Sequence, residues 1–530
     1  MFVLEGKGVG AERVTVPGAE RGHIEFKSRL IQSYHLRPER RQQLVAQMRA
    51  RIEEGRGVAV YVIGVDDDGE VVGLNEVELE ESIAVVRAIA AECGARVKRV
   101  ERFSSERGEI AKVVIEALTR TLVNHVTLGV AGHVNHGKST LIACLLTGES
   151  DDGTKWLYMD TLPHEIARNL SADLHFAVLG FKEGKPILVK NPLDKREKAR
   201  VVSEAEKIVS VVDTVGHEPW LRTTIRGLLG QEVDYGLVVV AADDGPTHIT
   251  REHLGILFAA GIPVILCITK VDKVGSRRLE EVREEVARLV KRVGRVPVHV
   301  RELSDLNVVI DKLNVVVPVL ETSSVTRQGF DLLYQLLSML PARPKPSDRP
   351  FLMYVDRVYD VEGTGTVVSG TILQGRLRSG ATLLLGPDQK GGFAEVRARS
   401  IEIHNARVEE AEAGQIVGIA IRGVPHDWVR RGMVLADKEV GPEAVWSFEA
   451  EVLILSHPTR IASGYEPIVH CHTISQSARM EVLDGDYLKP GEQGRARFHF
   501  KYRPEFLRPG DVFVLREGRV KGIGRVISAG

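Results

Sequence analysis

Residues 126–147 read VTLGVAGHVNHGKSTLIACLLT, and this stretch decides the fold. Its first six residues are typical of a buried strand and its last eight of a helix, and GHVNHGKS between them matches the pattern G-x-x-x-x-G-K-[ST]. In that context the backbone N–H groups of the loop turn inward onto phosphate oxygens, and the start of the helix adds positive potential. We expect Lys138 to reach the β- and γ-phosphates and the Ser139 hydroxyl to ligate Mg²⁺. The predicted phosphate-binding residues are Gly132, His133, Val134, Asn135, His136, Gly137, Lys138, Ser139 and Thr140.

Outward from this stretch, short apolar runs alternate with helical patterns as far as about residue 340. Apolar strands separated by helices predict a mainly parallel sheet that is covered on both faces. We therefore expect residues 124–341 to form a doubly wound α/β domain of the P-loop type. The runs expected to be its strands are Val126 to Ala131, Ile208 to Val212, Leu237 to Ala241, Pro263 to Ile268 and Val315 to Leu320.

The chain changes character on either side of that domain. Four prolines between residues 341 and 350 predict a stiff linker at 342–350. The short, Gly-punctuated strands beyond it predict two antiparallel β-barrels, at 351–440 and 441–530. Before the α/β domain, strand and helix patterns predict a small N-terminal α/β domain at 21–123, preceded by a flexible arm at 1–20.

Composition sets further limits. The chain has 530 residues with 71 Lys or Arg against 72 Asp or Glu, a formal net charge of −1 that excludes a uniformly basic nucleic-acid coat. Its four cysteines are scattered without a CxxC pair, which argues against a disulfide scaffold or a cysteine-rich zinc site and fits a reducing compartment. No apolar run approaches about 18 residues, and the start of the chain lacks an apolar signal segment. We therefore expect a multidomain cytoplasmic protein with no membrane contact.

The sequence DTVGH at residues 213–217 follows the apolar run that ends at Val212. An acid at that strand end is expected on the Mg²⁺ side of a phosphate site, so Asp213 is predicted to hold the metal through a water molecule. The Gly216 N–H could sense the γ-phosphate, and His217 lies where a side chain could position the attacking water. A histidine after a glycine is more often an ordinary surface residue, but these neighbours favour a catalytic role.

Two further strand ends carry signals for the base. Thr269-Lys270-Val271-Asp272 follows one apolar run, and the carboxylate of Asp272 could accept hydrogen bonds from guanine N1–H and the 2-amino group, which adenine lacks. Lys270 would pack along the base. After the next run, Ser323 and Ser324 would offer backbone N–H groups to guanine O6. The predicted guanine-binding residues are Thr269, Lys270, Asp272, Ser323 and Ser324.

The segment EIARNLS at residues 165–171 lies in a polar insertion between the phosphate loop and Asp213. The Ser171 hydroxyl could complete the coordination of Mg²⁺ when this segment closes on the γ-phosphate. A solvated loop without a function is an equally good interpretation of these residues alone. The predicted metal-site residues are thus Ser139, Ser171 and, through water, Asp213.

Together these motifs resemble those of the translational GTPases, the class that includes elongation factor Tu. GHVNHGKS is similar to the GHVDHGK[ST] of that class, DTVGH to its D-x-x-G-H, and residues 165–171 to its first switch, E-x-x-R-G-[IL]-[TS]. The stretch from Gly363 to Gly370 is similar to the opening of its second domain. The segments from Arg503 to Phe506 and from Arg516 to Gly518 are similar to parts of the third.

A narrower resemblance points to an archaeal-type member of the GTP-binding protein 1 and 2 family, and it covers nearly the whole chain from Gly22. It implies GTP hydrolysis on the ribosome, with GTP or GDP and Mg²⁺ bound and with aminoacyl-tRNA, stalled ribosomes or mRNA-decay machinery as partners. The segments that carry it are residues 22–27 (GHIEFK), 47–49 (QMR), 54–57 (EGRG), 61–69 (YVIGVDDDG), 170–173 (LSAD) and 213–224.

Three residues depart from the pattern of the wider class. Asn135 replaces the usual acid beside the phosphates, which would weaken a monovalent cation site there and slow hydrolysis. Asn169 replaces the usual glycine of the first switch, and asparagine tolerates a left-handed backbone better than most residues. Ser171 replaces threonine and keeps the hydroxyl, as the narrower family does.

Charge patterns give two more expectations. From Tyr487 to the C-terminus, ten Lys or Arg face four acids, which indicates a phosphate-facing patch on the last barrel, with solvated strand faces as the alternative. Phe498, Phe500 and Tyr502 alternate with that charge and are expected in the core rather than as stacking platforms. The run from Lys195 to Arg200 is expected to be a solvated loop.

Three functions fit the sequence. The first is an RNA-handling GTPase that acts on ribosomes. The second is a GTPase regulatory subunit of a metabolic enzyme of the sulfate-activation type, against which the N-terminal segments argue. The third is a module that holds GTP but scarcely hydrolyses it, suggested by Asn135.

Overall fold

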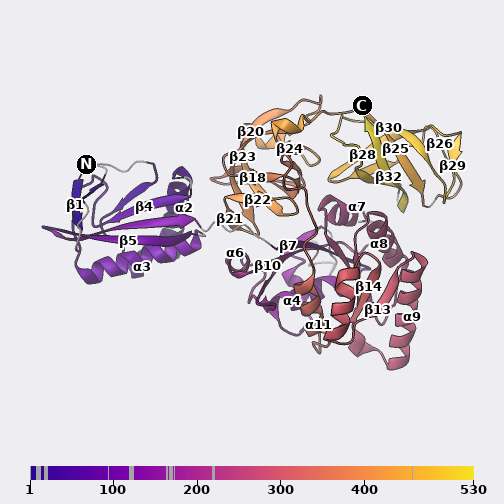
Figure 1. Cartoon of the computed structure of the whole chain (residues 1–530), viewed down its shortest axis with the longest axis horizontal. Helices are drawn as coiled ribbons and strands as arrows, with labels where there is room; N and C mark the ends of the chain where they lie inside the picture. The colour runs from indigo at the N-terminus through magenta and orange to yellow at the C-terminus, as the bar shows by residue number, and fades with distance from the viewer. Residues whose placement is uncertain are drawn as a thin grey trace. The chain divides into compact units, whose positions relative to one another are not determined.

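The computed structural model describes residues 2–6, 13–16, 22–55, 57–93, 95–117, 124–162, 165, 171, 173–217, 221–455, 457–517 and 519–530. The chain divides into two compact units, one made of residues 1–120 with 406–409 and the other of residues 121–405 with 410–530. Figure 1 shows the elements of both units with their labels. No described helix is both long and apolar enough to cross a membrane.

The first unit is a six-stranded sheet with three helices. Helices α2 and α3 pack on one face of the sheet, where Leu44, Met48 and Ile83 meet Tyr61 and Val113 in one buried cluster. The strand order is β2-β1-β5-β6-β4-β3. The elements are β1 (Phe2–Gly6), β2 (Arg13–Val16), β3 (Ile24–Lys27), α1 (Gln32–His35), α2 (Pro38–Glu54), β4 (Val58–Ile63), α3 (Glu76–Glu92), β5 (Ala95–Ser105) and β6 (Gly108–Ala117).

This sheet begins earlier in the chain than the sequence indicated. Within the residues predicted to form a flexible arm, Phe2–Gly6 and Arg13–Val16 pair as antiparallel strands, and β1 also pairs with β5. The start of α3 follows from its sequence, because Asn75 and Glu78 form a reciprocal capping box.

The second unit begins with an eight-stranded sheet of order β13-β14-β12-β11-β7-β10-β8-β9. All pairs from β13 to β10 are parallel, and the edge strands β8 and β9 are antiparallel, so the predicted doubly wound α/β class is confirmed. Its strands are β7 (His125–Gly132), β8 (His175–Lys182), β9 (Lys185–Ile187), β10 (Lys207–Asp213), β11 (Tyr235–Ala241), β12 (Val264–Thr269), β13 (Val296–His299) and β14 (Val316–Glu321).

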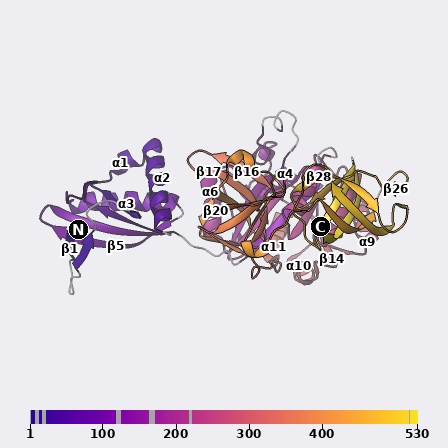
Figure 2. The ribbon, with the colours of Figure 1, turned by 90° about the horizontal axis from the view of Figure 1, so that it is seen from above.

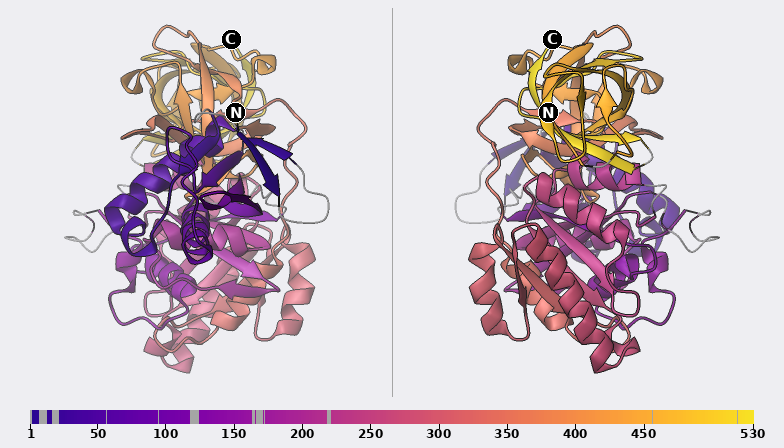
Figure 3. Two further views of the ribbon diagram at one scale, coloured as in Figure 1. Left: turned by 90° about the vertical axis from the view of Figure 1, so that its left-hand side faces the viewer. Right: turned by 90° about the vertical axis from the view of Figure 1, so that its right-hand side faces the viewer.

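Helices flank this sheet, as Figures 1 and 3 show. Every residue of β10, β11 and β12 is buried, which explains why their sequences are continuous apolar runs rather than alternating ones. The helices are α4 (Lys138–Thr147), α6 (Lys195–Glu204), α7 (Leu221–Ile225), the π-helical turn η3 (Arg226–Gly230), α8 (His248–Ala259), α9 (Ser276–Arg292), α10 (Leu303–Val309) and α11 (Phe330–Met339).

The loop predicted for Lys195 to Arg200 is wrong, because these residues open helix α6. Asp194 caps this helix by accepting a hydrogen bond from Arg196 N–H at 2.8 Å. Val201 and Val202 anchor its other end in the core. Asp194 is a common N-cap residue and could have indicated a helix, but the run of charged residues after it favoured a loop.

Two closed six-stranded barrels follow, as predicted, and their orange and yellow strands form separate groups in Figure 2. The first of them closes because β15 pairs with both β24 and β17. The first of the two contains β15 (Leu352–Tyr354), β17 (Gly365–Gln374), β19 (Thr382–Gly386), β20 (Ala394–Ile403), β23 (Ile416–Arg422) and β24 (Val434–Ala436), with β16 (Arg357–Val361) beside β17. The other contains β25 (Ser447–Ile454), β27 (Ile468–Cys471), β28 (Ile474–Val482), β30 (Gln493–Phe500), β31 (Val512–Glu517) and β32 (Arg519–Ala529).

We call the barrel at 351–440 barrel 2 and the barrel at 441–530 barrel 3, keeping domain 1 for the α/β domain. The turn between β27 and β28 lies where barrel 3, barrel 2 and domain 1 meet. There His472 stacks on Tyr354 of barrel 2, with ring centroids 4.4 Å apart. Its Nδ1 lies 3.0 Å from Glu232 of domain 1, and its Nε2 lies 3.2 Å from Asp511 of its own barrel.

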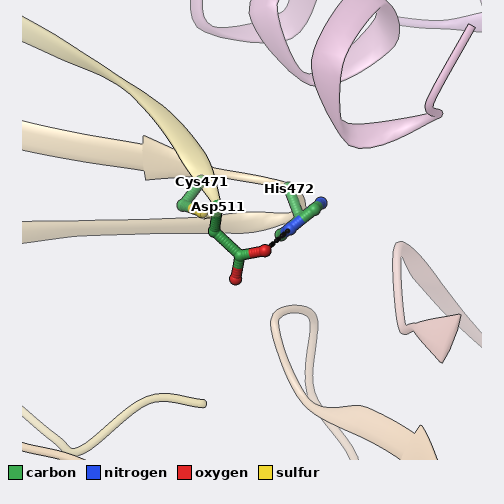
Figure 4. Close-up of side chains that lie close together, drawn as sticks. All are labelled: Cys471, His472 and Asp511. Atoms are coloured by element: carbon green, nitrogen blue, oxygen red, sulfur yellow. Dashed lines mark ion pairs between the residues drawn. The ribbon is translucent and has the colours of Figure 1, made fainter. Parts of the chain in front are cut away.

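Cys471, His472 and Asp511 lie close enough together to raise the question of a metal ion (Figure 4). The contacts are instead those of an ion pair: each imidazole nitrogen faces a carboxylate oxygen, and the Cys471 thiol donates to Val512 O. Burial lowers the pKa of His472, but Asp511 and Glu232 together raise it to about 10. The ring is therefore an imidazolium that forms ion pairs with both carboxylates.

Replacing His472 with Gln should destabilise the second unit by ~3–5 kcal/mol near neutral pH, because the buried Asp511 and the partly exposed Glu232 would lose their shared cation. Since the folded pKa is raised to about 10, the stabilisation is complete below about pH 6.5 and is lost as the pH rises toward 10. Denaturant melts of both proteins at several pH values between 6 and 10 measure this. The exposed His426→Gln variant is the control, and a stability difference that does not shrink with rising pH would contradict the assignment.

Candidate nucleotide site

The predicted site residues gather at one edge of the eight-stranded sheet. The phosphate loop follows β7, Asp213 ends β10, Thr269 ends β12, and Ser323 follows β14. These strands are parallel neighbours or next neighbours in the sheet, so their carboxyl ends share an edge. Ligands of open α/β sheets bind at this edge.

The phosphate loop needs two glycines for its shape. Gly132 has φ 147°, and a side chain there would lie 2.3 Å from Val239 O. Gly137 has φ 85° and precedes the first turn of α4. Asn135 also lies in the left-handed region, at φ 59°, which asparagine tolerates well. The substitution at this position is therefore compatible with the shape of the loop, although it removes a charge.

A cluster of oxygen atoms lies at the start of α4. Ser139 donates a hydrogen bond to Asp213 Oδ2 at 2.7 Å, and the Ser139 and Ser171 hydroxyl oxygens are 3.4 Å apart. The structure thus brings together the three residues predicted for the metal site. A fourth residue, Asp160, accepts a hydrogen bond from Ser171 and is only 4% exposed. The sequence reasoning missed Asp160, since it stands alone in a polar insertion with no motif around it.

These carboxylates and Lys138 share one buried environment. Burial raises the pKa of Asp213 to about 6, and Lys138 opposes that shift. Burial likewise lowers the pKa of Lys138, against the attraction of Asp213 and Asp160. The Lys138 ammonium donates to His133 O at 3.0 Å across the loop. The charges therefore stabilise one another where they lie, at the place expected for phosphate and metal.

We call residues 213–217 and 221–230 the second switch region, and its first part packs directly onto this loop. A side chain at Gly216 would place its Cβ 2.6 Å from Gly132 O, so only glycine fits there. The next residue, His217, is exposed at the end of the described stretch. Residues 218–220 and 166–170, which include Asn169, lie outside the described residues. His217 thus follows Gly216, the glycine that packs against the phosphate loop, and its catalytic role stays a prediction.

The two guanine loops are side by side, because β12 pairs with β14. Lys270 adopts a left-handed backbone at φ 56°, and its ammonium lies 3.6 Å from Asp243. Asp272 follows in a short 3₁₀ turn with its side chain exposed. Ser323 is buried, and its hydroxyl accepts a hydrogen bond from Thr326 N–H at 3.1 Å. An exposed carboxylate next to an ordered serine loop is the arrangement that the guanine prediction requires.

Hydrogen bonds from several side chains fix the phosphate loop, and one of these side chains, the buried His253, was missed by the sequence reasoning. Thr269 donates its hydroxyl to His136 O at 2.7 Å, which ties a guanine strand to the phosphate loop. His136 Nε2 lies 2.9 Å from Asp244 Oδ2. The buried His253 accepts a hydrogen bond from Gly132 N–H at 3.1 Å, and burial lowers its pKa to about 3. His253 is therefore neutral, as an acceptor must be.

Acids pair with part of the basic excess of barrel 3, and the phosphate-facing patch stays a prediction. Five of the ten basic side chains meet carboxylates on neighbouring strands or turns. Three of the five, Arg495, Arg497 and Lys501, pair with acids that precede Tyr487 in the chain and were therefore not counted, whereas Glu505 and Asp511 are two of the four acids counted. The paired residues are Arg495 with Asp484, Arg497 with Glu449 and Glu481, Lys501 with Glu466, Arg503 with Glu505, and Arg508 with Asp511. Phe498 and Phe500 lie in the core, as expected, but Tyr502 is 63% exposed.

The fold and the edge loops define a P-loop GTPase. The family model of the elongation factor Tu GTP-binding domain matches residues 123–342, and that of elongation factor Tu domain 2 matches residues 365–436. GTP-binding protein 1 of Xenopus laevis is 33% identical over 493 residues, which cover 91% of this chain and 75% of that protein. GTP-binding protein 2 of Mus musculus is 33% identical over 530 residues, covering 96% and 87%. Elongation factor 1-alpha of Methanopyrus kandleri is 30% identical over 448 residues, covering 77% and 96%.

Solved structures show the same fold. A bacterial selenocysteine-specific elongation factor, EF-Sec, matches with a TM-score of 0.59 at 23% identity, covering 77% of this chain. The chain spans 59% of the length of that protein. Elongation factor SelB of Methanococcus maripaludis, in complex with the GTP analogue GPPNHP, matches with a TM-score of 0.55 at 21% identity, covering 77% of this chain and 80% of that one.

The chain belongs to the translational GTPase family, and it is similar over nearly its whole length to GTP-binding proteins 1 and 2. The resemblance read from its motifs is thereby confirmed. A GTP-binding domain of the elongation factor Tu type implies that the protein binds and hydrolyses GTP.

Replacing Asp272 with Asn should weaken GTP binding by about tenfold to a hundredfold, because the amide loses the charge and one acceptor for the guanine N–H groups. Calorimetric titration with GTP, GDP and ATP measures the change. Asp311→Asn is the matched control, since Asp311 is also exposed in a three-residue 3₁₀ turn. Unchanged GTP affinity in the Asp272 variant would refute the base assignment.

Proposed function

We propose that this protein is a GTP-hydrolysing translational factor that acts on the ribosome. The observation that carries the proposal is the closed cluster of Ser139, Ser171 and Asp213 beside the phosphate loop, since it joins both switch segments to the nucleotide site. A segment that closes on a nucleotide-dependent metal is how such proteins signal the presence of a γ-phosphate.

The residues present fit Mg²⁺. Every donor in the cluster is an oxygen, which this hard cation prefers. Within the described structure, Asp213 Oδ1 is buried and has no hydrogen-bond partner, so a charged acceptor is left over for a metal-bound water. Ser139 and Ser171 would hold the ion directly and Asp213 through water. When bound, Mg²⁺ would neutralise charge on the β- and γ-phosphates.

The chain's own residues supply the rest of the mechanism. The loop glycines and Lys138 hold the phosphates, Gly216 lies against the loop, and Asp272 selects guanine. His217 would orient the attacking water when a partner moves it inward. Its present exposure supports a need for such a partner, and a GTPase that awaits activation is slow alone because its catalysis depends on positioning.

Replacing His217 with Ala should leave GTP and GDP affinities within about twofold and lower ribosome-stimulated turnover by about a hundredfold or more, as for the loss of a positioning group. Single-turnover hydrolysis with and without ribosomes measures this. The exposed His426 of barrel 2 provides the control, His426→Ala. Stimulated turnover near the wild-type rate would remove His217 from the mechanism.

A cavity of about 320 Å³ supports a phosphate-bearing cargo such as aminoacyl-tRNA. It lies where domain 1 and the two barrels meet, and no acidic side chain is among the described residues that line it. Its cationic lining includes Arg226 from the second switch region, Arg431 from barrel 2 and Arg516 from barrel 3. Because cations from three domains surround one cavity, this site suits the end of a nucleic acid better than the flat side of one.

Replacing Arg516 with Glu should weaken binding of aminoacyl-tRNA by about tenfold and make its salt dependence shallower, because one phosphate contact is lost. Titrations at two salt concentrations, with a non-hydrolysable GTP analogue present, measure both effects. Arg525→Glu is the control, an equal charge reversal on an exposed residue of the same barrel that lies away from the cavity lining. Equal losses in both variants would point to general attraction rather than to the cavity.

A module that holds GTP with little hydrolysis is the second candidate, and Asn135 favours it. The residue occupies a left-handed position in the phosphate loop and brings no charge to a monovalent cation. The ribosome-stimulated assay separates the two functions. Co-sedimentation with ribosomes also separates the proposal from a metabolic regulatory subunit, and stalled complexes or mRNA-decay machinery are tested as partners in the same way.

A further inference from the structure

One carboxylate links the first switch segment to two other parts of the second unit. Asp173, two residues after Ser171, accepts a hydrogen bond from Arg226 of the π-helical turn η3. Its other oxygen, Oδ2, lies 3.1 Å from Arg357 Nη2 of barrel 2. The end of the first switch is therefore held from the second switch region and from a barrel at the same time.

Arg357 makes more than this one contact with the segment. Its Nη2 also donates to Leu174 O at 2.6 Å, and its guanidinium lies 5.3 Å from the centre of the Phe176 ring. Three consecutive features of the segment (a carboxylate, a backbone carbonyl and an aromatic ring) thus meet one arginine. The planar guanidinium can serve all three, whereas a lysine ammonium cannot.

Arg226 and Arg357 also share a second carboxylate, that of Asp356. Arg226 Nε lies 3.4 Å from Asp356 Oδ1, and Arg357 Nε lies 3.9 Å from Asp356 Oδ2. Asp356 is buried, and Arg431 donates to its backbone carbonyl at 2.7 Å. Three arginines and two aspartates thus form one network with an excess of one positive charge.

A separate clasp holds the same segment from inside domain 1. The buried carboxylate of Glu165 accepts hydrogen bonds from Leu162 N–H and Asp173 N–H, both at 3.1 Å, and from His175 at 2.9 Å. It joins the two ends of the segment that contains Ser171. The hydrogen bonds of Glu165 fix the two ends of the segment. Asp173 is the residue of the segment that forms an ion pair with barrel 2, through Arg357.

We propose that Arg357 is a positioning residue for the nucleotide site, which holds Ser171 at the metal through Asp173. This rests on the proposed roles of Ser139, Ser171 and Mg²⁺. Barrel 2 thereby takes part in recognising the γ-phosphate without touching it. Ser171 is needed only when the segment is closed on a nucleoside triphosphate, so the contribution of Arg357 should appear with GTP and be absent with GDP.

The test uses the full chain with Arg357→Met, which keeps much of the side-chain length and removes the charge. We expect the affinity for a non-hydrolysable GTP analogue in Mg²⁺ to fall about tenfold while the GDP affinity stays within about twofold. We also expect the Mg²⁺ concentration needed for half-maximal binding of the analogue to rise. Arg357→Lys should recover only part of the loss, because it restores the charge but not the fork.

Arg378→Met is the matched control, because Arg378 is a barrel 2 arginine that pairs with one carboxylate, Glu410, on an exposed strand. It should bind both nucleotides like the wild type. Equal weakening of GTP analogue and GDP by Arg357→Met would show a general structural role and overturn the inference, as would no change at all. Ribosomes are absent from this test, so its failure is distinct from failure of the proposed function, which a wild-type protein without GTP binding or stimulated turnover would show.

Discussion

The hydrogen bond from Ser139 to Asp213 is the interaction on which the rest of the structure depends. It joins the first turn of α4 to the end of β10. It can form only when β7, which leads into the phosphate loop, pairs with β10 in the observed register. Gly216 can lie against the loop only because that register is kept. The phosphate loop, Asp213 and Gly216 therefore pack together as one unit. The first switch contacts this unit through Ser171.

Burial of charge explains why so many polar groups surround this construction. Lys138 and Asp213 are both buried, and each favours the charged form of the other against the cost of burial. The same rule operates farther away, where the charged ring of His472 lies between two carboxylates at the junction of the barrels and domain 1. Polar networks of this kind favour the observed arrangement of the domains, because losing one partner would leave a buried charge unpaired.

The sequence predicted the site residues that stand in short local motifs. It missed the contacts that form only when strands pair and domains pack. The phosphate loop, Asp213 and Asp272 stand in short motifs at strand ends, so their gathering at one edge followed from the parallel sheet. Asp160 and the Glu165–His175 clasp could not be found, because their partners lie elsewhere along the chain or outside any motif. The same holds for the partners of Arg497 and Lys501 in barrel 3: Glu449 and Glu466 precede the counted segment and come close to it only in the folded barrel.

With the proposed role of Arg357, the contacts of Asp173 would make the nucleotide state and the barrel interdependent. If closure of the first switch is favoured by Arg357, then whatever displaces Arg357 must weaken closure by the same free energy, since coupling between sites is reciprocal. The cavity that Arg226 and Arg431 help to line is next to that network. A phosphate group bound there would compete with Asp173 and Asp356 for the same arginines or would draw them closer together. Either way cargo binding and metal-site closure would share these arginines, and this gives the barrels a direct physical route to the state of the nucleotide.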